Sequence, residues 1–206
     1  MQRFSAVQVA FACNSDHLPF SADFIFPLDE KWQKLLRSPY LILREFSHEP
    51  SFAPKGKTIM QAMVFVNEPT AREWISLYEN KTKYAEKKDE FAKMVESVIV
   101  KKFPRYKADL QLLDVWTPAT YKRYTQAEIG SFMSFILPKN KLPLPISSKV
   151  RGLQNVFLAT QWQQPPGGLP TAAEMGKRAV KAVVYQEQRK PLPFSLPFFK
   201  GKKQKA

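Results

Sequence analysis

The chain is poor in the residues that mark several functional classes. Its 206 residues include one cysteine, two histidines and seven glycines. A single cysteine, Cys13, excludes an internal disulfide. The histidines, His17 and His48, show no metal-ligand spacing, and we expect a surface role for each. There is also no apolar run of about 18 residues, so the sequence predicts no membrane-spanning helix.

Motifs of hydrolytic and dinucleotide chemistry are missing as well. Ser131 stands in Gly130-Ser131-Phe132, which does not match the nucleophile elbow of α/β-hydrolases. None of the glycines forms the Gly-x-Gly-x-x-Gly turn that holds the pyrophosphate of a dinucleotide. The sequence therefore contains no self-contained site for hydrolysis, for metal chemistry or for anchoring a dinucleotide.

Acidic residues are scarce relative to basic ones. Lysine and arginine number 32 against 18 acidic residues, which gives a net charge of +14. Part of this charge lies in a Pro- and Phe-rich tail, 187–206, for which we consider three alternatives: a solvated tail, contact with an anionic membrane surface, or nucleic-acid binding. No nucleic-acid motif accompanies the charge, so no nucleic-acid partner is predicted. The apolar run at the start of the sequence is too short for a signal peptide, so we expect none. We expect a cytoplasmic protein, peripheral at a membrane surface under the second alternative.

The rest of the composition is that of a globular protein. The chain is 44% hydrophobic, with 16 Phe and four Trp to fill a core, and its length suits one large domain or two small ones. Apolar periodicity predicts strands over 1–14, 41–46, 58–66, 110–117 and 132–137, and helices over 29–36 and 82–103. Thr70-x-x-Glu73 is a capping-box pattern. This mixed order of elements predicts an α+β (mixed α/β) fold.

The most informative segment is 155–183. Val156 to Ala159 predicts a short strand, Gln163 to Gly168 predicts a loop, and Pro170 suits the first turn of a helix. One face of that helix collects small and apolar residues, which would allow close packing: Ala172, Gly176, Ala179, Val180 and Val183. The glycines would let a ligand approach the backbone, and the N–H groups at the helix start would face it. Such a loop binds an anion or an electron-rich ring edge.

This segment resembles the C-terminal cofactor motif of FAD-dependent oxidoreductases of the phytoene desaturase, carotenoid isomerase and retinol saturase type, in the flavin amine oxidase-like superfamily. The family has a strand end, a Pro/Gly loop and a helix with small residues in the same order. A second segment, 114–125 followed by Gly130-Ser131-Phe132-Met133, is similar to the family's Thr-Pro-x-Thr-x-x-Arg-Tyr-Thr … Gly-Ser pattern. A looser third match is 47–57. The three segments keep the family's order, and the resemblance covers most of residues 4–186.

The resemblance implies an FAD cofactor and a set of residues around it. The implied cofactor-binding residues are Thr160, Gln161, Gly167, Gly168, Leu169, Pro170, Thr171 and Ala172. Arg123 and Tyr124 are implied near the flavin or the substrate, with an ordinary surface charge as the alternative for Arg123. A plain turn is the alternative for the two loop glycines. Thr160 and Thr171 stand where glycine is frequent in the family, and Met175 replaces a common Ser or Thr. No catalytic residue is assigned, because the flavin itself carries the hydride chemistry.

The resemblance also implies a domain plan. Residues 1–149 would form a substrate-domain-like α+β region, 150–186 the C-terminal segment of an incomplete FAD-binding domain, and 187–206 the tail. The chain would then be the C-terminal part of a flavoprotein that moves hydride between flavin and an apolar isoprenoid or polyene-like substrate. Its partner would be the N-terminal Rossmann half, if encoded separately. Without that half, we expect weak or no FAD binding and no activity. The alternative is a non-enzymatic basic α+β protein that binds an anionic membrane surface or a protein partner.

Overall fold

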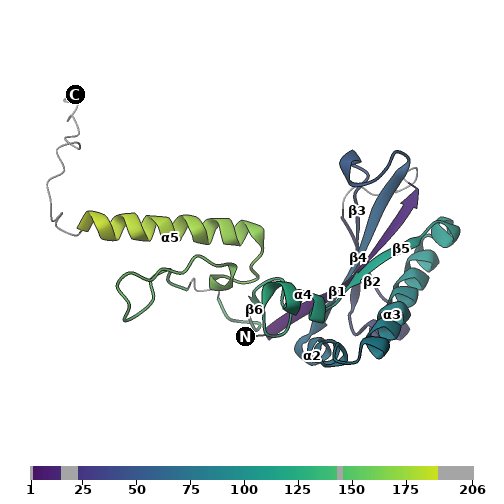
Figure 1. The fold of residues 1–206 in the computed structure, drawn as a ribbon, viewed down its shortest axis with the longest axis horizontal. Coiled ribbons are helices and arrows are strands. Elements are labelled where there is room, and N and C mark those ends of the chain that lie inside the picture. Colours follow the sequence, from purple (N-terminus) through teal and green to yellow (C-terminus); the bar gives the residue numbers. More distant parts are fainter. Residues whose placement is uncertain (1, 15–22, 143–145, 190–206) are drawn as a thin grey trace. The chain divides into compact units, whose positions relative to one another are not determined.

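A computed structural model describes residues 2–14, 23–142 and 146–189 (Figure 1). It divides into two compact units, residues Met1–Leu142 (unit 1) and Pro143–Ala206 (unit 2). His17 and the tail from 190 onward lie outside the described residues, so the predictions made for them stay predictions.

The described part of unit 1 is built on an antiparallel sheet. Its strands are β1 (Gln2–Asn14), β2 (Asp23–Pro27), β3 (Tyr40–Glu45), β4 (Lys57–Asn67) and β5 (Gln111–Trp116), in the order β2-β3-β4-β1-β5. A sixth strand, β6 (Phe135–Ile136), pairs with the beginning of β1. It is shorter than the strand expected over 132–137, because its ladder reaches only Gln2 and Arg3 of β1. Strands and helices together confirm the α+β class.

Helices connect and cover these strands. They are α1 (Glu30–Leu36), α2 (Glu68–Leu77), α3 (Lys81–Lys102) and α4 (Pro118–Thr125), with 3-10 turns η2 (Pro50–Phe52) and η3 (Pro104–Ala108). The helices expected over 29–36 and 82–103 are confirmed. Asp29 caps α1 by accepting the N–H of Trp32 at 3.1 Å. Pro104 follows Phe103, the C-cap residue of α3, and proline cannot continue the helical hydrogen-bond pattern.

The capping box expected at Thr70-x-x-Glu73 is wrong. The side chain of Asn67, the last residue of β4, accepts the N–H of Thr70 at 3.1 Å and so caps α2 three residues earlier. Thr70 is then the third helical residue, and Glu73 forms an ion pair with Arg37 at 2.7 Å. Asparagine is among the best N-cap residues, which explains why the helix begins there.

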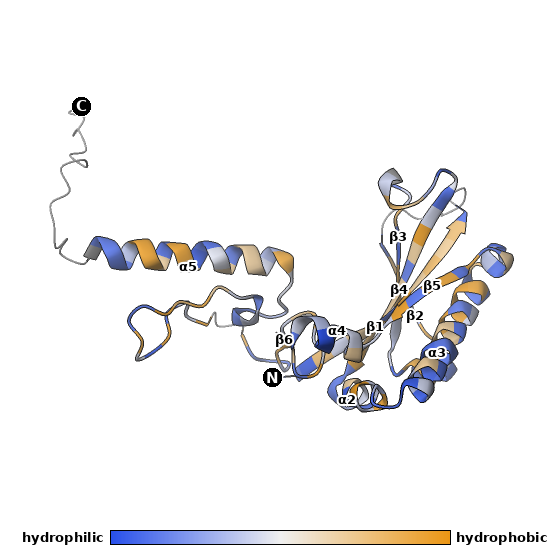
Figure 2. Cartoon of the chain, viewed as in Figure 1, coloured by the Kyte–Doolittle hydropathy of each residue, from blue (hydrophilic) through white to orange (hydrophobic). Residues whose placement is uncertain are grey.

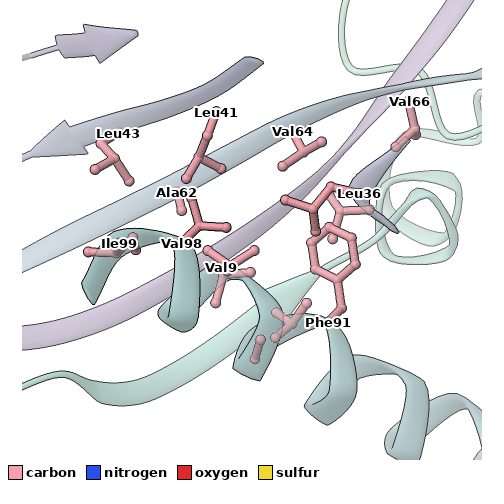
Figure 3. Close-up of a cluster of buried hydrophobic side chains, with 14 of the residues drawn as sticks. Val9, Leu36, Leu41, Leu43, Ala62, Val64, Val66, Phe91, Val98 and Ile99 are labelled. Carbon is pink, nitrogen blue, oxygen red and sulfur yellow. The ribbon is translucent and has the colours of Figure 1, made fainter. Parts of the chain in front are cut away.

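The core lies between one face of the sheet and α3 (Figure 3). In the close-up, Val9, Leu43 and Val64 of the strands point toward the helix, whose Val98 and Ile99 point back at them. On α3, Phe91, Val95, Val98 and Ile99 are buried, and Met94 packs partly buried against the same core. Each fully buried side chain of this size contributes about 1.5–3 kcal/mol through the hydrophobic effect.

The opposite face of the sheet is less covered. Alternation along the strands places on it the residues between the core positions. Ile25, Tyr40 and Phe65 of this face are 61%, 54% and 39% exposed. Near its middle, the side chain of Gln61 donates to that of Gln8 at 3.1 Å. Unit 1 therefore presents an open sheet face that mixes apolar, aromatic and amide side chains.

Unit 2 consists, in its described part, of irregular chain, the 3-10 turn η4 (Gln161–Gln163) and the long helix α5 (Leu169–Arg189). The strand expected over Val156–Ala159 is wrong as an element, since this stretch makes only one isolated antiparallel bridge, between Lys149 and Phe157. A strand needs a partner ladder, and the described residues of this unit supply none. As a result Val156 and Leu158 are 43% and 37% exposed.

Candidate functional site

The loop before α5 is closed by its own polar side chains. The N–H of Gly168 donates to Oε1 of Gln161 at 2.6 Å, which joins the two ends of the loop. Thr160 and Gln163 cap the η4 turn reciprocally, and the Thr160 N–H donates to Oε1 of Gln163 at 3.0 Å. Gln163 is 1% exposed, and its Nε2 donates to the Ile146 carbonyl at 3.3 Å. These bonds fix the course of the backbone as it enters the helix.

Sequence reasoning missed Gln163, although the sequence carries a signal for it. Thr160-x-x-Gln163 has the Ser/Thr-x-x-Glu/Gln spacing of a capping box, which marks the start of a helical turn. The two residues form such a box in the structure, around a 3-10 turn rather than an α-helix. Gln163 is therefore a positioning residue for the loop, at a place expected only to be irregular.

Two adjacent glycines give the loop its sharp approach to α5. Gly167 has φ = +85° and Gly168 has φ = +95°, a region that side-chain-bearing residues adopt only with strain. The Thr171 hydroxyl donates to the Gly167 carbonyl at 3.0 Å, and the Ala172 N–H donates to the Gly168 carbonyl at 2.9 Å. The helix therefore begins immediately after the second glycine.

The first turn of α5 suits an electron-rich ligand. It contains no acidic residue, and the N–H groups of Leu169 and Thr171 have no acceptor within the helix because they stand at its beginning. Pro170 brings no N–H group at all. The helix dipole places partial positive charge at this end. The geometry can bind an anionic group or the edge of an electron-rich ring.

The eight predicted cofactor residues all lie between Thr160 and Ala172, in the 3-10 turn η4, the glycine loop and the start of α5. Oε1 of Gln161 already accepts the N–H of Gly168. Leu169, the first residue of α5, is 87% exposed. The binding roles of all eight residues stay predictions.

Hydrophobic and hydrophilic residues are interspersed along helix α5 (Figure 2). Met175 and Ala179 are buried, at 0% and 6% exposure, and they pack the helix on its own unit. The single face expected from the sequence is partly wrong, because Val180 and Val183 are 63% and 38% exposed. A Cβ placed on Gly176 would meet no atom within 4 Å. The close packing expected from the small residue at Gly176 is thus not made by the described residues, which leave that side of the helix open.

Arg123 and Tyr124 lie on α4 in unit 1, whereas the glycine loop lies in unit 2. The Arg123 guanidinium donates to the Tyr124 hydroxyl at 3.1 Å and stands 4.7 Å from the centroid of its ring. Hydrogen bonding to Tyr78 raises the pKa of Arg123. Tyr124 is 74% exposed. A shared site between this pair and the glycine loop stays a prediction.

The Thr-Pro … Gly-Ser segment forms a tight corner in unit 1. Thr117 caps α4 in a capping box, and its Oγ1 lies 2.7 Å from the hydroxyl of Tyr84. Gly130 has φ = +63°, and a Cβ there would lie 2.7 Å from the carbonyl carbon of Pro118. The Ser5 hydroxyl donates to the Gly130 carbonyl at 2.6 Å. Within this chain, therefore, the segment's threonine, proline and glycine have a structural role that needs no ligand.

The described residues give little support for a cysteine nucleophile, a histidine site or a metal site. Burial raises the pKa of the Cys13 thiol to about 12, which makes it a poor nucleophile. His48 is exposed and stacks on Phe46, as expected for a surface residue. Across the described ranges, no group of three or more His, Cys, Asp or Glu could hold a metal ion, and no helix there is long and apolar enough to cross a membrane.

Comparison with known proteins adds no relative. No protein-family model matches the chain, and a search of curated proteins finds no significant match.

Proposed function

We propose that this chain is the C-terminal, substrate-domain-containing part of an FAD-dependent oxidoreductase of the phytoene desaturase, carotenoid isomerase and retinol saturase type. The observation that carries the proposal is the Gly167-Gly168 turn. It combines two positive φ angles, closure by Gln161 and an acid-free helix start in a segment that resembles the family's cofactor motif. The turn would bring backbone N–H groups to the flavin edge, where they stabilise negative charge on the reduced ring.

The open surfaces of unit 2 fit a piece of a larger domain. On α5, Val180 and Val184 are 63% and 47% exposed and have no cover among the described residues. Among the described residues, no sheet is available for the chain at Val156 and Leu158 to join. A dinucleotide-binding half would supply that sheet and would bury both surfaces. It would be encoded separately or as another part of the same polypeptide.

The open sheet face of unit 1 fits an apolar substrate. Ile25, Tyr40 and Phe65 expose apolar surface on it. An isoprenoid or polyene-like molecule binds by such non-directional contacts. In this proposal the protein orients the substrate and excludes water, and bound FAD supplies the hydride chemistry.

Flavin loading tests the proposal. The purified chain with added FAD should show little bound flavin in its visible spectrum, whereas coexpression with a neighbouring reading frame that encodes a Rossmann half should give a yellow complex. In that complex, Gly168→Val should lower flavin content, because a β-branched residue cannot adopt φ = +95° without strain. The matched control is Gly152→Val, since Gly152 also has positive φ in unit 2 but lies outside the loop. Equal flavin content in both variants would refute the assignment.

We also propose, from the sequence, that the tail 187–206 contacts anionic membrane surfaces. Basic residues near such a surface each contribute about 1 kcal/mol, and the tail interleaves them with Phe194, Phe198 and Phe199. Liposome sedimentation should recover the whole chain, but not a version ending at Gln186, with vesicles that contain anionic lipid. The difference should shrink with salt. Equal recovery of both versions would remove the membrane role and leave a solvated tail.

A further inference from the structure

A polar, aromatic pocket on unit 1 lies outside the glycine loop. It is lined mainly by Tyr78, Tyr84, Lys88, Trp116, Arg123 and Tyr124, and its volume is about 160 Å³. That is smaller than the roughly 300–1,000 Å³ of pockets for drug-sized ligands. Its residues come from the end of α2, from α3, from β5 and from α4, so the fold assembles it from four separate elements.

The arginine of this pocket has neutral partners. Arg123 donates to the phenol of Tyr124 and hydrogen-bonds that of Tyr78. Five other arginines of the described chain are ion-paired with carboxylates: Arg3, Arg37, Arg44, Arg72 and Arg178. A guanidinium presents a planar set of donors that matches a carboxylate or phosphate. An anion that binds Arg123 would therefore replace only its hydrogen bonds to the Tyr124 and Tyr78 phenols.

The surroundings of Arg123 strengthen its positive potential. Lys81 Nζ lies 2.9 Å from the centroid of the Tyr78 ring. Hydrogen bonding to Lys81, and then to Arg123, lowers the pKa of the Tyr78 phenol. The carboxylate that lines the pocket is Asp114, which is engaged by Lys88 at 3.1 Å and by the Val115 N–H at 2.6 Å. The net charge around the pocket is positive.

The walls of the pocket are aromatic. The rings of Tyr78 and Tyr84 meet edge to face with their centroids 5.1 Å apart, and Trp116 and Tyr124 add two further rings to the lining. Aromatic faces and edges favour a flat ligand, because stacked and edge-on ring contacts add to the effect of buried area.

We propose that this pocket binds a small planar organic anion, a carboxylate on an aromatic or conjugated ring, with Arg123 on the carboxylate and the tyrosine rings around the plane. This site stands on unit 1 alone and does not depend on the flavin proposal. A flavin-free chain should bind the anion equally well, so the two proposals can fail separately.

The site is tested by titrating the whole chain with benzoate at low salt. Binding is measured from the shifts of backbone amide signals in NMR spectra. Arg123→Gln should raise the dissociation constant about ten- to hundredfold, as expected for a lost hydrogen bond between charged groups. The matched control is Arg105→Gln. It removes one positive charge from the same unit, at a residue whose guanidinium lies 5.3 Å from the Tyr106 ring and outside the pocket. Asp114→Asn should tighten binding severalfold, because it removes the lining carboxylate and releases Lys88.

Two further probes separate charge from shape. Inorganic phosphate should bind more weakly than benzoate, and neutral benzyl alcohol should bind more weakly still. No benzoate binding at millimolar concentration, or equal effects of Arg123→Gln and Arg105→Gln, would overturn the site. Equal affinity for phosphate and benzoate would overturn the planar ligand, and equal affinity for benzyl alcohol would overturn the anion.

Discussion

Replacing Gly130 by alanine should be among the most damaging single changes in unit 1. A Cβ at this position would lie 2.7 Å from the carbonyl carbon and 2.9 Å from the Cα of Pro118, and both atoms belong to the backbone at the start of α4. Such atoms cannot turn aside as the end of a flexible side chain can. The residue also has φ = +63°, which alanine adopts only with strain.

The two effects can be added. Left-handed backbone costs a non-glycine residue about 1–2 kcal/mol, and forcing an extra carbon into packed structure costs about 1–3 kcal/mol. Gly130→Ala should thus lower the free energy of unfolding by about 2–5 kcal/mol, a large share of the roughly 5–15 kcal/mol of a typical domain. Gly56→Ala is the matched control, because Gly56 has φ = +80° with no atom within 4 Å of a Cβ. It should cost only the first term, about 1–2 kcal/mol.

Urea unfolding followed by tryptophan fluorescence measures both variants. Trp32, Trp74 and Trp116 lie in unit 1, so the signal reports mainly on that unit. The midpoint should fall much further for Gly130→Ala than for Gly56→Ala, with an unchanged slope. Equal midpoints for the two variants would show that the backbone at Pro118 moves aside at little cost in free energy. This result would refute the argument from backbone contact.

Three other changes should give measurable effects. Gly176→Ala should slow amide hydrogen exchange in α5, because alanine stabilises a helix interior by about 0.5–1 kcal/mol over glycine and the site is open; faster exchange would refute this. Leu43→Ala should lower the free energy of unfolding by about 2–5 kcal/mol, since Leu43 is fully buried, whereas an exposed control, Leu35→Ala, should change it little. Ion pairs to Arg72 and then Arg3 lower the pKa of Glu128 from 4.5 to about 2. Their stabilisation should be complete above pH 4.5 and lost as the pH falls toward 2, and Glu128→Gln should flatten that part of the stability curve.

Local patterns predicted most strands of unit 1 and the helices α1 and α3, but they missed the strand β2 (Asp23–Pro27) and the helix α4 (Pro118–Thr125). On α3, the spacing of Phe91, Val95 and Ile99 indicates which side of the helix is buried. On β4, the alternation of residues does the same, because side-chain direction follows from backbone periodicity. The start of α2 was misplaced for a local reason. Two N-cap candidates, Asn67 and Thr70, stand three residues apart, and only the folded backbone shows which of them caps.

Unit 2 shows where such reasoning fails. Residues 156–159 have the composition of a strand, yet a strand exists only where another strand offers hydrogen bonds, and the described chain offers a single bridge. On α5 the apolar residues cover a wide part of the helix surface, and periodicity cannot say which of them the protein buries. The structure buries Met175 and leaves Val180 exposed.

The sequence by itself determined the α+β class, the main elements of unit 1, and the glycine-rich turn with a helix behind it, because each depends on neighbours within a few positions. The tertiary structure decided which distant residues meet. Tyr78, Lys88 and Arg123 line one pocket only because α2, α3 and α4 converge beside β5. Gly130 has no room for a Cβ because the chain returns to Pro118. Contacts of this kind depend on packing between elements, which no local pattern of residues encodes.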